Sequence, residues 1–122
     1  MNPKIVLVED EEILRENLKE ILEINNFEVS DFSNGNQVLE YLKSNKTSLI
    51  ISDLMMPEMD GHRLLQQIRS NEWTKDIPFI LLSAKIEQDD RDKSFALGAD
   101  QYLIKPIKTV DLIKSIKSIL KD

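Results

Sequence analysis

The 122-residue sequence contains no cysteine, one histidine, three glycines and four prolines. Without cysteine, the chain has no disulfide, no thiolate metal site and no cysteine nucleophile. It also lacks an apolar run long enough to cross a membrane, and its first four residues lead directly into an apolar run without the layout of a signal peptide. We therefore expect one domain over residues 1–122, with the cytoplasm as its default location.

Basic residues are too few to balance the acidic ones. Lysine and arginine number 16 against 22 aspartates and glutamates, which gives a net charge of −6. This charge disfavours direct binding to nucleic acid and to an anionic membrane surface. Hydrophobic residues make up 41% of the chain, which is enough to form a core.

Short apolar runs alternate with longer amphipathic segments along the whole chain. The short runs predict strands at residues 5–8, 27–32, 49–53, 77–82 and 102–104, the second of which is polar enough for a sheet edge. Apolar residues at helical spacing predict helices around residues 14–22, 38–42, 64–68, 86–97 and 112–120. Gly98 suits a left-handed position after the fourth helix, and Thr109 suits the N-cap of the fifth.

This alternation predicts an α/β fold in which a five-stranded parallel sheet is covered by helices on both faces. With right-handed crossovers, one doubly wound solution has the flavodoxin-like strand order 2-1-3-4-5. Its order reverses between strands 1 and 3, and a ligand crevice opens there at the carboxyl ends of the strands.

Polar residues follow four of the predicted strands at these ends. They are Glu9 and Asp10 after the first strand, Asp53 at the end of the third, Ser83 after the fourth and Lys105 after the fifth. Three carboxylates in one crevice repel one another and need a cation. Mg²⁺ suits them, because it prefers oxygen ligands and keeps several waters.

This set of side chains predicts phosphoryl chemistry. A carboxylate such as Asp53 can attack phosphorus and become an acyl phosphate. A metal ion and Lys105 would neutralise the phosphoryl oxygens, and the Ser83 hydroxyl can donate a hydrogen bond to one of them. The chain has no P-loop, so nucleotide cleavage by that route is not expected.

Several short motifs occur in order along the chain. They are Val8-Glu9-Asp10, Asp53-Leu54-Met55-Met56-Pro57-Glu58-Met59-Asp60-Gly61, Leu82-Ser83-Ala84, Leu97-Gly98-Ala99-Asp100 and Tyr102-Leu103-Ile104-Lys105-Pro106. With these motifs the sequence resembles the receiver domain of two-component response regulators, over essentially its whole length. Each motif alone is weak, but the complete set at family-like spacing is highly specific.

The resemblance implies a role for each matched position. Asp53 would be the phosphoacceptor, and Lys105 would pair with the phosphoryl group. Asp10 would ligate Mg²⁺ directly, Glu9 mostly through water, and Met55 through its backbone carbonyl, with Mn²⁺ as a substitute ion.

The resemblance also implies a switch and its timing. Ser83 would be the switch hydroxyl, and Tyr102 the aromatic ring whose rotamer follows it. Met55 and Lys85 would tune the lifetime of the phosphoryl group, and a bulky Met55 favours slow hydrolysis. The Lys105–Pro106 peptide bond is expected to be cis.

The expected partners follow from the same resemblance. A histidine kinase or a histidine phosphotransfer protein would donate the phosphoryl group to Asp53. The surface formed by the fourth helix, fifth strand and fifth helix would then change to control an effector of unknown identity, or to pair with a second copy in a phosphorylation-dependent homodimer. The domain would catalyse only its own phosphorylation and dephosphorylation, so we do not expect an enzyme with a turnover substrate.

Three other functions remain as alternatives. A haloacid-dehalogenase type phosphohydrolase would carry Asp-x-Asp at Asp53, but the third position here is Met55. A phosphorylation-independent interaction module would normally have lost an acidic residue or the lysine. A flavin-binding protein of this fold would have a phosphate-cradling loop after the first strand, and the sequence shows none.

Other residues have more ordinary interpretations. His62, the single histidine, is expected at the surface or in a cap, and Trp73 in packing or at a rim. Met55, Met56 and Met59 together predict a soft binding surface near Asp53. Four lysines of the last helix, at positions 108, 114, 117 and 121, indicate a solvated face.

Overall fold

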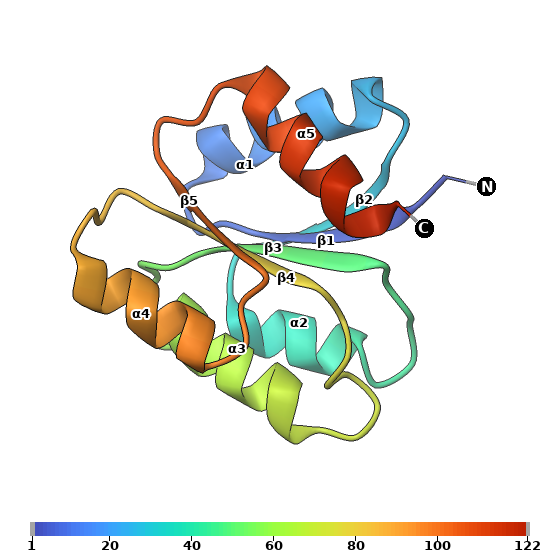
Figure 1. Cartoon of the computed structure of the whole chain (residues 1–122). Coiled ribbons are helices and arrows are strands. Elements are labelled where there is room, and N and C mark those ends of the chain that lie inside the picture. Colours follow the sequence, from blue (N-terminus) through green and yellow to red (C-terminus); the bar gives the residue numbers. More distant parts are fainter. Residues whose placement is uncertain (1, 122) are drawn as a thin grey trace.

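Five strands alternate with five helices along residues 2–121, the part of the chain that the computed structural model describes (Figure 1). The strands are β1 (Lys4–Val8), β2 (Glu28–Phe32), β3 (Leu49–Asp53), β4 (Phe79–Ser83) and β5 (Gln101–Ile104). The helices are α1 (Glu12–Ile24), α2 (Gly35–Tyr41), α3 (Gly61–Ser70), α4 (Gln88–Ala96) and α5 (Thr109–Leu120).

The strands form one parallel sheet in the order β2-β1-β3-β4-β5, so the predicted fold class and strand order are confirmed. Val8 pairs with both Phe32 and Ser52, Asp53 pairs with Leu82, and Ser83 pairs with Ile104. This register brings the carboxyl ends of all the strands to one edge of the sheet, which is where a doubly wound fold places its site.

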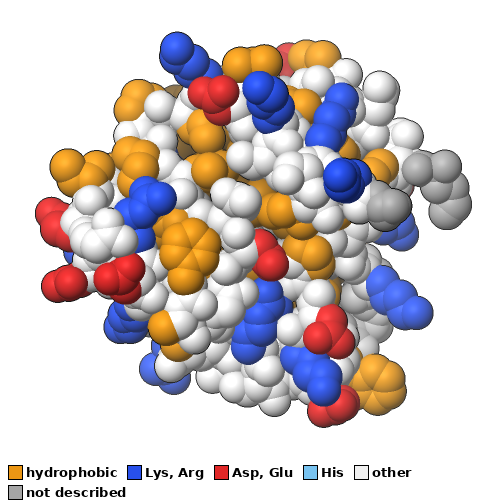
Figure 2. Space-filling model, in the orientation of Figure 1, with side chains coloured by type: hydrophobic (Ala, Val, Ile, Leu, Met, Phe, Trp, Pro, Cys, Tyr) orange, Lys and Arg blue, Asp and Glu red, His pale blue; other side chains and the backbone are white. Residues whose placement is uncertain are grey.

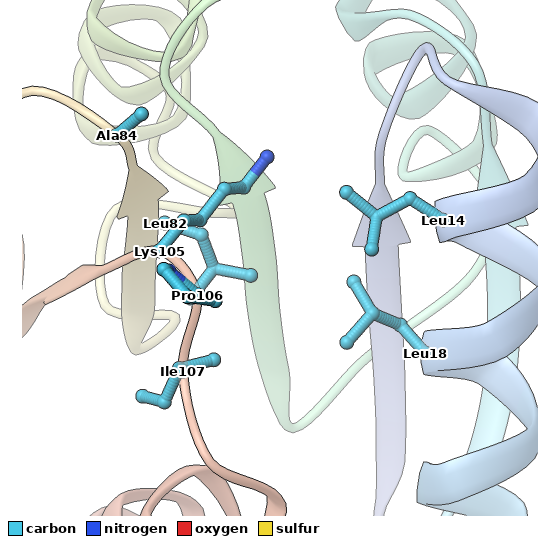
Figure 3. Close-up of a pocket in the computed structure, with 7 residues that line it drawn as sticks. All are labelled: Leu14, Leu18, Leu82, Ala84, Lys105, Pro106 and Ile107. Atoms are coloured by element: carbon cyan, nitrogen blue, oxygen red, sulfur yellow. The ribbon is translucent and has the colours of Figure 1, made fainter.

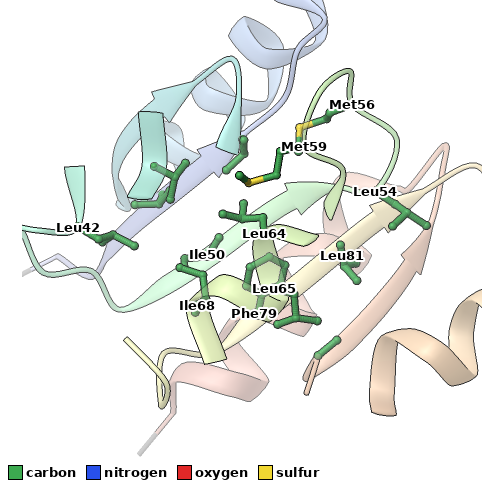
Figure 4. Close-up of a cluster of buried hydrophobic side chains, with 14 of the residues drawn as sticks. Leu42, Ile50, Leu54, Met56, Met59, Leu64, Leu65, Ile68, Phe79 and Leu81 are labelled. Atoms are coloured by element: carbon green, nitrogen blue, oxygen red, sulfur yellow. The ribbon is translucent and has the colours of Figure 1, made fainter. Parts of the chain in front are cut away.

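Helices α1 and α5 cover one face of the sheet, and α2, α3 and α4 lie on the other (Figure 1). Because successive residues of a strand point to opposite faces, β1 sends Ile5 and Leu7 into the core beneath α1 and α5, and Val6 into the core beneath α2 and α3. Figure 4 shows the second core, in which Phe79 and Leu81 of β4 meet leucines of α3. Both faces of the three central strands are therefore buried.

Local sequence explains where most helices begin and end. The side chains of Glu11, Asn34 and Asp60 accept hydrogen bonds from backbone N–H groups in the first turns of α1, α2 and α3. Gly98 has φ +106°, the left-handed conformation expected after α4. The prediction for Thr109 is wrong, because Lys108 occupies the N-cap and Thr109 is already helical.

The predicted methionine surface is also wrong for two of its three members. Met56 and Met59 are buried in the core beneath α3 (Figure 4), and only Met55 is exposed, at 53%. The methionines lie in the β3–α3 loop, whose Pro57 and Glu58 are exposed while Met59 turns inward against Gly35 at the start of α2. The prediction of Trp73 in packing or at a rim is also wrong, because its side chain is almost fully exposed.

His62 is buried, so its predicted surface position is wrong. Its Nε2 lies 2.7 Å from the hydroxyl oxygen of Ser94, and that hydroxyl donates to the carbonyl of Asp90 at 2.7 Å. A hydroxyl has one proton to give, so His62 donates to Ser94. This hydrogen bond joins α3 to α4, in which Ser94 is the one buried residue.

No helix within residues 2–121 is long and apolar enough to span a membrane.

Candidate functional site

The polar residues predicted from the sequence meet at the carboxyl edge of the sheet. Backbone hydrogen bonds continue beyond the strands and hold this edge together: the N–H of Glu9 donates to Phe32, that of Leu54 to Leu82, and that of Lys105 to Ser83. Because these bonds fix the backbone at Glu9, next to Asp53 and at Lys105, the sheet itself sets the distances between the side chains of the site.

Glu9, Asp10 and Asp53 form an acidic cluster. Each offers a carboxylate oxygen, and these oxygens lie within 4.8 Å of one another. Glu9 and Asp53 are buried while Asp10 is exposed, so the cluster opens to solvent on one side. Three carboxylate oxygens with open positions for water fit Mg²⁺, which prefers few protein ligands and a partly hydrated shell.

Lys105 lies against this cluster and joins two of its members. Its Nζ is 3.2 Å from Oε1 of Glu9 and 3.2 Å from Oδ2 of Asp53. Burial disfavours the charged lysine, but attraction to Asp53 and Glu9 outweighs it and raises the pKa of Lys105. The ammonium group is therefore a permanent positive charge at physiological pH, within reach of any group attached to Asp53.

Glu9 is held from several directions. One carboxylate oxygen accepts from the N–H of Glu11 at 3.1 Å, and the backbone carbonyl accepts from the guanidinium of Arg15 at 2.8 Å. Burial raises the pKa of Glu9, the hydrogen bond from Glu11 acts against this, and the charge of Asp53 raises the pKa further. A metal cation beside this carboxylate would offset both the burial and the repulsion.

Ser83, Lys85 and Tyr102 are connected by hydrogen bonds on the β4–β5 side of the site. The N–H of Lys85 donates to the Ser83 hydroxyl oxygen at 2.9 Å, and the Tyr102 hydroxyl donates to the Lys85 carbonyl at 2.9 Å. The Tyr102 ring is buried, with the guanidinium of Arg91 5.4 Å from its centre. The backbone of Lys85 therefore links the two residues that the sequence singled out as a switch.

Two features of the site were not predicted. Arg15 bridges the Glu9 carbonyl and the Asp31 carboxylate, 3.1 Å away. The sequence indicates this role only weakly, because Arg15 is simply a basic residue at the margin of the apolar stripe of α1. The second is an apolar pocket of about 390 Å³ beside Lys105. In Figure 3, Leu14 and Leu18 point from α1 toward the loop that holds Pro106, whose peptide bond with Lys105 is cis.

Comparisons with known proteins agree with this geometry. A sequence profile of the response regulator receiver domain matches residues 5–117. The transcriptional regulatory protein SrrA of Staphylococcus aureus is 36% identical over 121 residues, which make up 99% of this chain and 49% of that protein. The chain thus spans about half the length of the curated relatives that it matches.

Solved structures show the same architecture. The receiver domain of a signal transduction histidine kinase from Syntrophus aciditrophicus has a TM-score of 0.90 and 36% identity, covering 97% of this chain and 89% of that one. The receiver domain of the sensor histidine kinase PA1611 from Pseudomonas aeruginosa has a TM-score of 0.91 and 25% identity, covering both chains completely. That structure holds a magnesium ion coordinated in the active site cleft.

The chain therefore belongs to the response regulator receiver domain family, as its motifs predicted. Receiver domains are the phosphorylation-dependent signalling domains of two-component systems, and they accept phosphate from histidine kinases.

Proposed function

We propose that this chain is a phosphorylation-activated switch in which Asp53 accepts a phosphoryl group in a Mg²⁺-dependent reaction. The observation that carries this proposal is the position of Asp53, whose carboxylate lies both in the acidic cluster and 3.2 Å from the Lys105 ammonium. Asp10 and Glu9 would hold the ion with Asp53, and the Met55 carbonyl would complete the protein ligands, with Mn²⁺ as a substitute.

In the proposed reaction a carboxylate oxygen of Asp53 attacks the phosphorus of a phosphohistidine. An O–P bond forms, the P–N bond breaks, and the imidazole nitrogen leaves with the electron pair and takes up a proton. A bound Mg²⁺ would neutralise charge on the phosphoryl oxygens. Lys105 would pair with one of these oxygens, and the Ser83 hydroxyl, whose oxygen accepts from the Lys85 N–H, would donate its own proton to another. The domain modifies only itself, so we do not propose an enzyme with a turnover substrate.

A histidine kinase or a histidine phosphotransfer protein would be the donor. The pocket beside Lys105 supports this, because it is lined mainly by apolar side chains of α1, β4 and the β5–α5 loop: Leu14, Leu18, Leu82, Ala84, Pro106 and Ile107. An apolar residue on the donor helix would fit there next to its phosphohistidine. Exposed Met55 lies on the other side of Asp53 and offers a second contact.

After phosphorylation, Ser83 would move toward the phosphoryl group and break its bond with Lys85. That change would alter the hydrogen bond between Lys85 and Tyr102, and with it the surface of α4, β5 and α5. This surface would control a downstream effector, or pair two phosphorylated copies. A cytoplasmic location, where such kinases present their phosphohistidine, remains part of the same proposal.

Incubation with a small phosphodonor, with and without Mg²⁺, followed by intact mass spectrometry, tests the proposal. The expected result is a gain of one phosphoryl group that requires Mg²⁺ and disappears in Asp53→Asn. Lys105→Met should slow the mass gain, because the ammonium group no longer neutralises charge on the phosphoryl oxygens. No Mg²⁺-dependent adduct from either a small donor or a kinase would instead support a phosphorylation-independent interaction module.

The lifetime of the phosphoryl group provides a separate test. The backbone N–H of Met55 lies 3.4 Å from Oδ1 of Asp53, and its side chain stands at the open side of the site. We expect Met55 to obstruct the attacking water and to give a half-life of many minutes. Met55→Ala should shorten it several-fold, whereas a half-life of seconds for the unsubstituted protein would contradict this role.

A further inference from the structure

Helices α1 and α5 lie side by side on one face of the sheet, and their outer sides carry opposite charges. The outer side of α1 bears an acidic stripe, which consists of Glu12, Glu16, Glu20 and Glu23, all exposed. The outer side of α5 bears a basic stripe, which consists of Lys114, Lys117 and Lys121, also exposed. In Figure 2, blue side chains gather over α5.

No salt bridge joins a side chain of either stripe to another residue within the described part of the chain, although Lys19 attracts Glu23 one turn further along α1. The ion pairs that involve α1 run from Arg15 and Lys19 to Asp31, on the β2 side of the helix, and none joins the acidic stripe to the basic one. Like charges spaced three or four residues apart repel along a helix. Glu20 and Glu23 also lie near the carboxyl end of α1, where the helix dipole disfavours negative charge and the last turn has no basic residue.

The like charges within each stripe therefore weaken its helix, whereas Lys117 in the last turn of α5 is favoured by the helix dipole. Apolar side chains accompany them. Ile13 and Ile24 on α1 and Val110 on α5 are 66%, 72% and 66% exposed. A groove of about 470 Å³ runs along α5 beside the end of α1, and Val110, Ile113, Lys114 and Lys117 line most of it.

We propose that this face binds a second copy of the same chain, with α1 of each copy lying on α5 of the other. The charges select the symmetry. Helices α1 and α5 run in the same direction, since each follows a strand of one parallel sheet. A twofold axis parallel to the two helices places the acidic stripe of each copy over the basic stripe of its partner, which makes two complementary contacts. A twofold axis perpendicular to the helices would instead place the two acidic stripes on each other.

The lengths of the helices agree with this pairing. Helix α1 has 13 residues and α5 has 12, so both are close to 20 Å long. The groove beside Asn25, at the end of α1, is lined by Lys114 and Lys117, so these lysines would face the C-terminal part of the partner's acidic stripe. The contact area of two helix pairs is on the order of 1,000 Å², which defines a weak dimer. Because each copy has a net charge of −6, only a local match of charges overcomes the overall repulsion.

Sedimentation velocity of the full chain, without any phosphodonor, tests this dimer independently of the proposed phosphorylation. At low ionic strength and high protein concentration the weight-average mass should rise toward that of a dimer, and about 0.5 M salt should return it to a monomer. The double substitution Lys114→Glu with Lys117→Glu, or Glu16→Lys with Glu20→Lys, should weaken association at least tenfold.

Combining variants with exchanged charges distinguishes this specific pairing from a general effect of net charge on association. Mixing the two double variants should restore association, because both contacts are then complementary, and a chain with all four substitutions should again pair with itself at the original net charge. Lys43→Glu with Lys46→Glu, at the end of α2 on the opposite side of the sheet, is the matched control and should retain association. A protein that is monomeric at low salt, a mixture that stays monomeric, or an equal loss in the control would overturn the proposal.

Discussion

Gly61 provides a sharp test of how the fold supports Asp53, the proposed phosphoacceptor. It is the first residue of α3, and its N–H donates to the Leu54 carbonyl at 2.8 Å. A Cβ at this position would lie 2.7 Å from the Asp53 carbonyl oxygen, 2.7 Å from a methyl group of Leu81 and 2.9 Å from Cα of Leu54. Two of these atoms belong to the backbone directly beside Asp53, so they have little freedom to move.

The expected cost of Gly61→Ala follows from these distances. Ordinary carbon contacts are about 3.5–4 Å, so the backbone at Asp53 or the start of α3 must shift by more than half an ångström. Overpacking of this kind lowers the free energy of unfolding by about 1–3 kcal/mol. The higher helix propensity of alanine raises it by less than about 1 kcal/mol. A net loss of about 2 kcal/mol corresponds to a fall in Tm of about 8 °C for a chain of this length.

Gly35→Ala is the matched control. Gly35 is also the first residue of a helix, and its added Cβ would likewise meet a heavy atom at 2.7 Å, but that atom is the sulfur of Met59. A methionine side chain adapts more easily than backbone atoms do, so Gly35→Ala should lower the free energy of unfolding by clearly less than Gly61→Ala, even though Met59 is buried. Thermal and urea unfolding of both variants measure the difference, and equal losses of stability would refute the reasoning. The rate of Asp53 phosphorylation should also fall in the Gly61 variant alone.

Three other substitutions test separate contacts. Asp10→Asn removes one charge from the acidic cluster while keeping both ion pairs of Lys105. The Tm of the metal-free protein should therefore rise by a few degrees, and Mg²⁺ should no longer raise the Tm further. A lower Tm of the metal-free variant would show that the three carboxylates are not crowded. Arg69 donates to the carbonyls of Lys75, Ile77 and Gly98, so Arg69→Met should lower the free energy of unfolding by about 2–4 kcal/mol. Arg63→Met, at an exposed position, should leave it almost unchanged, and urea unfolding measures both. Burial, followed by the charge of Lys93, lowers the pKa of His62. The unfolded chain therefore binds a proton below about pH 6.5 that the folded chain resists, and stability is lost as the pH falls below that value. His62→Gln should reduce the fall in Tm between neutral and acidic pH, and identical profiles would contradict this.

The sequence predicts most of the fold because its signals are local. Runs such as residues 5–8 and 49–53 are apolar throughout, as central strands of a parallel sheet require, and the observed strands agree within two residues at each end. Helix α4 covers Gln88–Ala96, close to the predicted residues 86–97, although it has almost no apolar stripe to mark its limits. The starts of α2 and α3 lie three residues before the predicted ones.

The candidate site was predictable for the same reason. Glu9, Asp10, Asp53, Ser83 and Lys105 each follow a strand, and parallel strands end at a common edge, so position in the sequence alone brings them together. What the pattern omits is how they contact one another. The bridge from Lys105 to both Glu9 and Asp53 joins residues up to 96 positions apart and depends on how the β5–α5 loop packs.

The errors in interpretation have a common physical cause. His62 and Met59 were assigned to the surface because polarity, or closeness to Asp53, is all that the sequence shows. Tertiary packing buried the first against Ser94 and the second in the core beneath α3.

The sequence by itself determined the alternation of strands and helices and the edge at which the candidate site lies, because hydrophobic periodicity and chain connectivity leave few alternatives. The strand order 2-1-3-4-5 was one doubly wound solution, and the structure confirmed it. Apolar spacing also indicates which side of each helix faces outward. Only the tertiary structure decided how α1 and α5 lie relative to each other, because that depends on how each helix packs on the same face of the sheet. This packing sets an acidic stripe and a basic stripe on one side of the molecule.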